Sequence, residues 1–184
     1  MDKKRVILLI SIAFIGFLAL LFDKRLAILF VSLQNSILTP ILRVLEPLSF
    51  VLFFALIIAI MSLVIKKKRY VGSIVFSVIL STLVSFGLKF IIMRPRPFGF
   101  LEYIPFTQLI DYSFPSSHAV AMFALLPILS KEFKSLKWLW WALAIIVSFT
   151  RLYFGVHYLS DVILGGVIGY LLGYWITSRI KEKE

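Results

Sequence analysis

The amino-acid sequence predicts an all-α membrane protein: a polytopic helical bundle with six transmembrane helices and short interfacial helices on the extracytoplasmic side. Of the 184 residues, 61% are hydrophobic and only 16% are charged, and the mean hydropathy is +1.00, values far from those of soluble domains. Six apolar runs approach the length of about 20 residues that a helix needs to cross the hydrocarbon core. Basic residues cluster between these runs.

The composition also limits the domain organisation and the class of function. We expect one membrane-embedded domain over residues 1–184, with no room for a second, soluble domain. The formal net charge of +11 does not indicate nucleic-acid binding, because the basic residues do not lie along one amphipathic face. The absence of cysteine excludes disulfide bonds and thiolate chemistry, and it leaves the redox compartment open.

The six predicted spans cover residues 6–22, 48–65, 71–92, 116–129, 138–154 and 158–176. The first span follows a basic cluster, as a secretory signal does, but it lacks a clear cleavage site, so we expect a retained anchor. The apolar segment 26–45 is interrupted by Gln34, Asn35 and Pro40, which favours short helices at the membrane interface. The fourth span is short and contains Pro127, which neighbouring helices can accommodate.

Aromatic and small residues mark the last two spans. Three tryptophans between residues 138 and 141 follow a basic loop, and we expect them to anchor the fifth span at the headgroup level. Gly165, Gly169 and Gly173 recur every fourth residue along the sixth span. This spacing lets another helix approach closely, and packing within the chain is favoured over dimerisation.

The basic clusters predict the orientation of the chain. Lysines and arginines precede the first span, follow the second, separate the fourth from the fifth, and follow the sixth. These positions all fall on one side of the membrane, which the positive-inside tendency assigns to the cytoplasm. We therefore expect an integral cell membrane protein with both termini cytoplasmic. The segments 93–115 and 151–157 would lie together on the extracytoplasmic side.

The first polar group of interest joins the third span to the loop that follows it. A charge near mid-membrane costs about 2.5–3.5 kcal/mol even on the lenient insertion scale, so charged residues in apolar helices point to function. Lys89 lies near the extracytoplasmic end of the third span, seven residues before Arg96. Snorkelling to the headgroups is an equally good explanation of these two residues alone.

The second group is the segment 115–118, which opens the fourth span with a proline, Ser116 as a helix N-cap, Ser117 and His118. The free N–H groups of such a helix start form an anion site. The helix dipole contributes only about 0.3–1 kcal/mol, whereas one charge-assisted hydrogen bond contributes about 1.5–3 kcal/mol. Side-chain cations must therefore supply most of the affinity for a phosphate. A serine–histidine pair alone is more often a cap.

The third group is Thr150 and Arg151, followed by His157 and Asp161. His157 and Asp161 are spaced i, i+4, so their side chains share a face if the sixth helix starts near His157. The carboxylate of Asp161 can then accept a hydrogen bond from one imidazole nitrogen and leave the other nucleophilic. An interfacial ion pair is the alternative. Both histidines of the chain fall in these extracytoplasmic groups.

Together, the three groups resemble the motifs of the type 2 phosphatidic acid phosphatase superfamily, which includes membrane lipid phosphatases and vanadium haloperoxidases. Each motif is weak alone, but the combination is highly specific. The residue that follows Ser116 is usually glycine in the family, and serine usually stands at the position of Thr150. Ser117 keeps its backbone N–H and Thr150 keeps its hydroxyl, so these departures bear on pocket shape. The six-residue spacing selects Arg96 over Arg94.

The resemblance implies a role for each matching residue. His157 would be the nucleophile that forms a phosphohistidine, Asp161 would orient it, and His118 would protonate the leaving oxygen. The residues that would bind the phosphate are Lys89, Arg96, Ser116, Ser117 and Arg151. No cofactor is implied, and we expect no metal site, because the carboxylates on the outer side are scattered at Glu102, Asp111 and Asp161.

These observations predict a metal-independent membrane phosphatase acting on a lipid phosphomonoester or diphosphate. The resemblance ranks a polyprenyl diphosphate such as undecaprenyl diphosphate first, and phosphatidylglycerol phosphate or phosphatidic acid second. The expected partner is this lipid in the membrane, and the oligomeric state is open. A haloperoxidase is disfavoured, since those relatives are mostly larger and soluble. The alternative from another class is a non-catalytic protein that binds or moves lipid headgroups, which leaves His118 unexplained.

Overall fold

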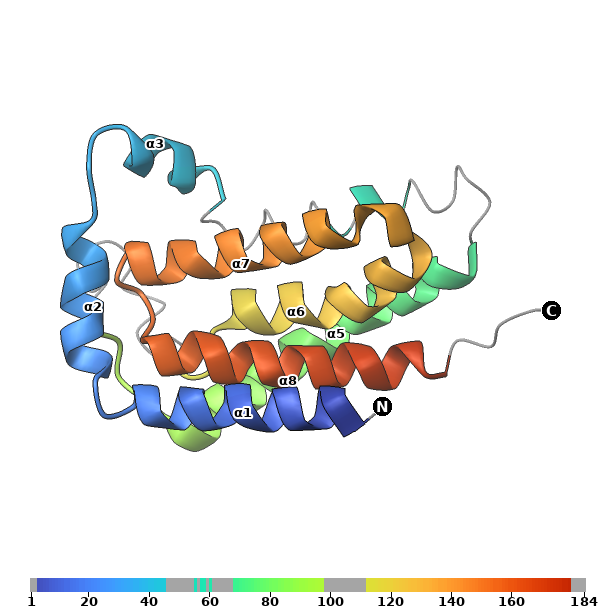
Figure 1. Cartoon of the computed structure of the whole chain (residues 1–184), viewed down its shortest axis with the longest axis horizontal. Helices are drawn as coiled ribbons and strands as arrows, with labels where there is room; N and C mark the ends of the chain where they lie inside the picture. The colour runs from blue at the N-terminus through green and yellow to red at the C-terminus, as the bar shows by residue number, and fades with distance from the viewer. Residues whose placement is uncertain are drawn as a thin grey trace.

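The computed structural model describes residues 3–45, 55, 57, 58, 60, 68–97 and 112–179, and no β-strand occurs among them (Figure 1). The predicted all-α class is therefore confirmed for this part of the chain. Its helices are α1 (Lys3–Ala19), α2 (Asp23–Ser32), α3 (Leu38–Arg43), α5 (Lys68–Ile92), α6 (Ser117–Glu132), the 3-10 turn η1 (Lys134–Leu136), α7 (Lys137–Tyr153) and α8 (Leu159–Thr177).

Helix α6 is the centre of the bundle. It packs against α5, α7 and α8, while α1 packs against α8 (Figure 1). Most side chains of α6 are buried, and Leu125, Leu126 and Ile128 are almost fully enclosed. The apolar residues of the fourth predicted span thus form the core, while Pro127 is accommodated inside the helix.

The glycines of α8 allow its close approach to α6. A methyl group added at Gly169 would overlap the carbonyl oxygen of Val120, and one added at Gly173 would overlap that of Ala124. Gly165 lies similarly against the backbone of Ser116. The prediction that this spacing serves packing within the chain is confirmed. The contact fixes the starts of α6 and α8 beside each other.

The first predicted span is divided by a sharp bend. Helix α1 ends at Ala19 instead of continuing to residue 22, and α2 starts at Asp23, three residues before the expected short-helix segment. The axes of the two helices differ by 88°, so α2 runs across one end of the bundle (Figure 1). Asp23, the first residue of α2, is buried there.

The polar residues that interrupt the segment 26–45 attach it to α7. The side-chain amide of Gln34 donates a 2.7 Å hydrogen bond to the carbonyl oxygen of Tyr153, and the N–H of Asn35 donates to the Tyr153 hydroxyl at 3.0 Å. The hydroxyl of Thr39, in α3, lies 2.9 Å from the same oxygen. The segment contains the short helices α2 and α3, and these contacts hold them over the end of α7. Their position at the membrane interface stays a prediction.

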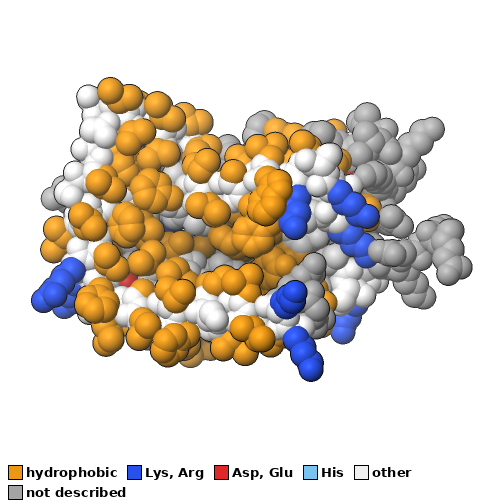
Figure 2. Space-filling model, viewed as in Figure 1, with side chains coloured by type: hydrophobic (Ala, Val, Ile, Leu, Met, Phe, Trp, Pro, Cys, Tyr) orange, Lys and Arg blue, Asp and Glu red, His pale blue; other side chains and the backbone are white. Residues whose placement is uncertain are grey.

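The described helices include two that are long and apolar enough to cross a membrane, Tyr70–Ile92 and Leu159–Thr177. The bent pair Val6–Ala19 and Asp23–Ser32 raises this number to three if it is one span. Most of the expected span 48–65 lies outside the described residues. The total of six spans therefore stays a prediction. Exposed apolar side chains cover much of the visible surface, which suits a protein solvated by lipid (Figure 2).

The tryptophans at the start of α7 do not form one interfacial group. Trp138 is exposed, but Trp140 is buried in the core, and Trp141 packs between Phe123 and Tyr170. The prediction of three anchors was wrong for Trp140, because a two-residue step turns a side chain to the opposite side of a helix. The same end of the bundle contains the start of α1 and the end of α8, and lysine and arginine side chains gather there (Figure 2).

Candidate active site

The predicted site lies where the first turns of α6 and α8 meet. The N–H of Ser116, the N-cap of α6, donates to the carbonyl oxygen of Asp161 in α8 at 3.2 Å. Helices α5 and α7 end on this side of the bundle, with Lys89 in the last turn of α5 and Arg151 in the last turn of α7. Two helix N-termini and two cationic helix ends therefore face one region, an arrangement that favours an anion.

Ser116 caps α6 through its backbone conformation only. Its side chain makes no capping hydrogen bond, and among the described residues its buried hydroxyl has no hydrogen-bond partner. This differs from the expected serine cap. The consequence is that a polar hydroxyl beside the helix start is available to a ligand. Ser117 and His118 follow in the first turn of α6, and His118 is buried.

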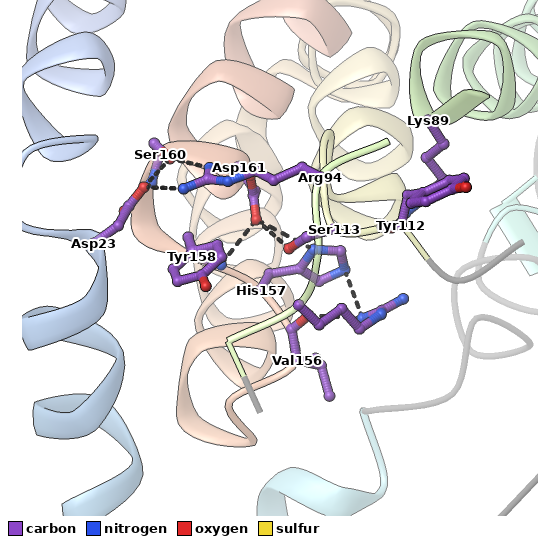
Figure 3. A network of polar contacts seen from close by, with 11 residues as sticks. Asp23, Lys89, Arg94, Tyr112, Ser113, Val156, His157, Tyr158, Ser160 and Asp161 are labelled. Atoms are coloured by element: carbon purple, nitrogen blue, oxygen red, sulfur yellow. Dashed lines mark hydrogen bonds and ion pairs between the residues drawn. The ribbon is translucent and has the colours of Figure 1, made fainter. Parts of the chain in front are cut away.

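His157 is held by the tight connection between α7 and α8. Its N–H and that of Val156 both donate to the carbonyl oxygen of Arg151, at 3.2 and 3.1 Å. Gly155 has a φ of 66°, a left-handed conformation that glycine adopts without strain and that closes this turn. The imidazole is buried (Figure 3). Its Nε2 lies 3.5 Å from Nη1 of Arg96.

The contact between His157 and Asp161 differs from the expected one. Nδ1 of His157 lies 3.8 Å from Oδ2 of Asp161, beyond hydrogen-bond length, and within the described chain Nδ1 has no hydrogen-bond partner. Helix α8 begins at Leu159, so His157 precedes it and the shared-face argument does not apply. The carboxylate Oδ2 instead accepts the N–H of Tyr158 at 2.9 Å and the hydroxyl of Ser113 (Figure 3).

The two neighbouring arginines have different surroundings. Arg96 donates from Nη1 to the carbonyl oxygen of Val156 at 2.7 Å, which brings its guanidinium to the imidazole. Arg94 contacts two carboxylates, with Nη1 lying 2.6 Å from Oδ1 of Asp161 and Nη2 lying 2.7 Å from Oδ2 of Asp23. Burial opposes the charge of Arg94, but the two carboxylates prevail and raise its pKa. Spacing thus selected the arginine next to the predicted nucleophile.

Lys89 is tied to the segment that leads into α6. It is almost fully buried, and its ammonium group donates to the carbonyl oxygen of Tyr112 (Figure 3). The N–H of Ser113 donates to the carbonyl oxygen of Arg94 at 2.7 Å. Met93, between these groups, has a φ of 47°, a strained left-handed conformation for a residue with a side chain. It ends α5 and turns the chain toward the site.

The electrostatics keep His157 uncharged at neutral pH. Burial, helped by the positive charges of Arg96 and Lys89, lowers the pKa of His157 to about 3, although Asp161 acts in the opposite direction. A neutral imidazole has a free nitrogen lone pair, which is the requirement for a nitrogen nucleophile. The cations around it would attract a phosphate and stabilise charge on its oxygens.

All eight predicted site residues lie at this end of the bundle. Direct contacts join Arg96, His157, Asp161, Ser116 and the backbone of Arg151. Sequence reasoning missed four buried or half-buried groups around Asp161: Asp23, Arg94 as a carboxylate ligand, Ser113 and Ser160. Asp23 is 137 positions from Ser160, and nothing in its local sequence signals the contact.

A family comparison identifies the chain. The model of the PAP2 superfamily matches residues 70–184, which include every predicted site residue. The chain belongs to the PAP2 superfamily.

Two crystal structures have the PAP2 fold seen here. One is the first transmembrane PAP2 type phosphatidylglycerolphosphate phosphatase from Bacillus subtilis, with a TM-score of 0.72, 22% identity and coverage of 92% of this chain and 94% of that one. The other, Aquifex aeolicus LpxE, has a TM-score of 0.70, 24% identity and coverage of 85% and 95%.

Curated PAP2-like relatives are similar over part of their length. An undecaprenyl-diphosphatase of Sulfolobus acidocaldarius is 34% identical over 130 residues, which are 66% of this chain and 59% of that protein. Phosphatidylglycerophosphatase B of Bacillus subtilis is 33% identical over 107 residues, 52% of this chain and 50% of that protein. The chain thus spans between half and three fifths of the length of these relatives. Asp23 lies outside the PAP2 match.

Proposed function

We propose that this PAP2 protein is a metal-independent membrane lipid phosphatase that works through a phosphohistidine at His157. The observation that carries the proposal is the environment of His157. Its imidazole is buried and neutral, Nε2 faces the guanidinium of Arg96, and Nδ1 faces the carboxylate of Asp161. A non-catalytic headgroup-binding protein needs the cations but has no use for a neutral, oriented imidazole between them.

The first half of the reaction transfers the phosphoryl group to the enzyme. Nε2 of His157 attacks phosphorus, an N–P bond forms, and the bond from phosphorus to the leaving oxygen breaks. His118 donates a proton to that oxygen. Asp161 stabilises the positive charge that develops on the imidazole. The phosphoryl oxygens are held by Lys89, Arg96 and Arg151, with the hydroxyl of Ser116 and the N–H of Ser117.

The second half returns the enzyme to its starting state. Water attacks phosphorus and gives a proton to His118, the N–P bond breaks, and inorganic phosphate leaves. His157 is again neutral and His118 is again protonated, so atoms and charges balance over the cycle. No three histidine, aspartate or glutamate side chains cluster as metal ligands within the described ranges. The charges that metal-dependent phosphatases take from bound ions are supplied here by the three cations.

The substrate ranked first is a polyprenyl diphosphate such as undecaprenyl diphosphate. The similarity to the Sulfolobus undecaprenyl-diphosphatase supports this ranking. The similarity to phosphatidylglycerophosphatase B supports phosphatidylglycerol phosphate as the second candidate, with phosphatidic acid beside it. The site lies at the end of the bundle opposite the starts of α1 and α7, near which lysine and arginine side chains gather. By the positive-inside tendency, this supports a site on the extracytoplasmic side and cytoplasmic termini.

Phosphate release by the purified protein tests the function. We expect turnover of undecaprenyl diphosphate or phosphatidylglycerol phosphate in detergent, unchanged by EDTA, and loss of turnover in the folded His157→Ala variant. Lys134→Ala, an exposed position at the opposite end, serves as the control and should retain wild-type turnover. Normal turnover by His157→Ala would disprove the nucleophile. Activity that EDTA abolishes and magnesium restores would disprove metal independence. A folded wild-type protein that binds both lipids without releasing phosphate would favour the non-catalytic alternative.

A further inference from the structure

Asp23, at the start of α2, is a buried carboxylate that the reaction above does not use. Its side chain is only 3% exposed. Oδ1 accepts the backbone N–H of Ser160 at 3.1 Å, and Oδ2 accepts the hydroxyl of Ser160 and Nη2 of Arg94, the latter at 2.7 Å. These contacts connect α2 to the first turn of α8 and to the chain after α5 (Figure 3). The bend between α1 and α2 delivers the carboxylate to this position.

Arg94 transmits the position of Asp23 to Asp161. Its second amino group, Nη1, donates to Oδ1 of Asp161 at 2.6 Å and to the hydroxyl of Ser160 at 2.7 Å. The guanidinium also lies over the ring of Tyr158, 4.1 Å from the centroid. Because a guanidinium is planar with donors at fixed angles, the atom that Nη2 holds determines where Nη1 points. Two carboxylates from distant segments are thus joined through one rigid group.

Asp161 faces the predicted nucleophile with its other oxygen. Oδ1 is held by Arg94, and Oδ2, which receives the N–H of Tyr158, lies 3.8 Å from Nδ1 of His157. Because a carboxylate is planar and its Cβ is attached to the backbone, holding Oδ1 restricts the rotation of Oδ2, which also accepts hydrogen bonds from the Tyr158 N–H and the Ser113 hydroxyl. Any rotation of Asp161 would change its distance to Nδ1, where the positive charge of the phosphohistidine develops. Displacements of about 1 Å at such a centre can reduce a rate about 100-fold.

We propose that Asp23 is a positioning residue for the reaction, acting through Arg94 on Asp161. The proposal rests on the function proposed above. It assigns a role in turnover to α2, which lies outside the region matched to the PAP2 superfamily. The competing explanation is that Asp23 only holds the α1–α2 bend against α8. The two explanations differ in whether the effect of Asp23 requires Arg94.

A double-variant cycle separates these explanations. We expect Asp23→Asn, which keeps the side-chain shape and removes the charge, to lower kcat between about 10- and 100-fold while KM changes less than about twofold. Arg94→Gln should lower kcat at least as much. The kcat of the double variant should equal the kcat of Arg94→Gln alone, because the two side chains act as one unit. Lys24→Gln, the exposed neighbour on α2, is the control and should keep the wild-type rate.

Two further readouts distinguish positioning from folding. The inhibition constant for inorganic phosphate, which reports ground-state binding of an anion in the cationic pocket, should change less than about threefold in Asp23→Asn. The apparent Tm in detergent should stay close to that of Lys24→Gln. Wild-type kcat in Asp23→Asn would overturn the proposal. The proposal would also be overturned if the reductions in kcat caused by the two substitutions multiply in the double variant, since Asp23 would then act independently of Arg94. A fully active His157→Ala would instead refute the proposed function, so the two failures are distinguishable.

Discussion

The charge state of His157 links the chemistry of the site to the stability of the protein. The pKa of this residue is about 3 in the native protein, against 6.5 for an unperturbed histidine, because the imidazole is buried near two cations. Between these two pH values the unfolded chain binds a proton that the native protein does not. The free energy of unfolding must therefore fall as the pH decreases from 6.5 toward 3, and His157 adds no pH dependence above that range.

The first residue-scale prediction concerns this pH dependence. We expect the contribution of His157 to reduce the free energy of unfolding by about 1.4 kcal/mol per pH unit below about pH 6. Thermal unfolding of wild type and His157→Gln in detergent, between about pH 7.5 and pH 4, measures it. The carboxylates titrate in both proteins, so the comparison isolates the imidazole. As the pH is lowered, the apparent Tm of wild type should decline more steeply than that of the variant. Parallel declines would contradict the prediction, because they would mean that His157 binds a proton in the native protein as readily as in the unfolded chain.

Single residues also show how far the site could be predicted from the sequence. The resemblance to the family motifs placed Arg96, His157 and Asp161 in one site, and the structure brings them together although Arg96 is 61 positions from His157. The expected hydrogen bond between His157 and Asp161 is not formed, since Nδ1 lies 3.8 Å from Oδ2. That expectation required α8 to start near His157, whereas α8 begins at Leu159. Asp23 was beyond prediction, because only the packing of α2 on α8 brings it there.

At the scale of helices, the α6–α8 contact determines how the site is assembled. Both helices contribute their first turns to the site. In the turns that follow, the glycines of α8 allow its backbone to approach the backbone of α6 closely. The sequence predicted this packing because small residues every four positions form one continuous face of a helix. It predicted the first span as continuous because residues 6–22 contain no charged residue. The structure instead bends by 88° between α1 and α2, and Asp23 is buried at the start of α2.

The prediction at this scale compares two glycine substitutions. Gly169→Ala should destabilise the protein by about 1–3 kcal/mol, because the added methyl overlaps the Val120 carbonyl and α8 must move. Gly72→Ala in α5 has no atom within 4 Å of the new methyl and should be neutral or stabilising by up to about 1 kcal/mol. Thermal unfolding in detergent measures both. Equal Tm values for the two variants would mean that α8 and α6 do not pack this closely in the membrane.

For the whole molecule, the two ends of the bundle differ in character. One end carries the starts of α1 and α7 and the end of α8, and several lysine and arginine side chains lie on its surface (Figures 1 and 2). The other end carries the candidate site and α2, which has two exposed basic residues, Lys24 and Arg25. The positions of the basic clusters along the chain predict an orientation through the positive-inside tendency, and this orientation stays a prediction. The number of spans is less accessible to sequence, since α1 and α7 have 17 residues each and α6 has 16, near the lower limit for crossing.

The orientation of the whole molecule can be tested directly because the chain contains no cysteine. Single variants Lys24→Cys, beside the candidate site, and Lys134→Cys, at the basic end, place one thiol at each exposed end. A membrane-impermeant maleimide applied to intact cells should label Lys24→Cys and should label Lys134→Cys only after permeabilisation, with the cysteine-free wild type as the blank. The reverse pattern would put the site in the cytoplasm, and it would mean that the lipid phosphate is taken from the inner leaflet.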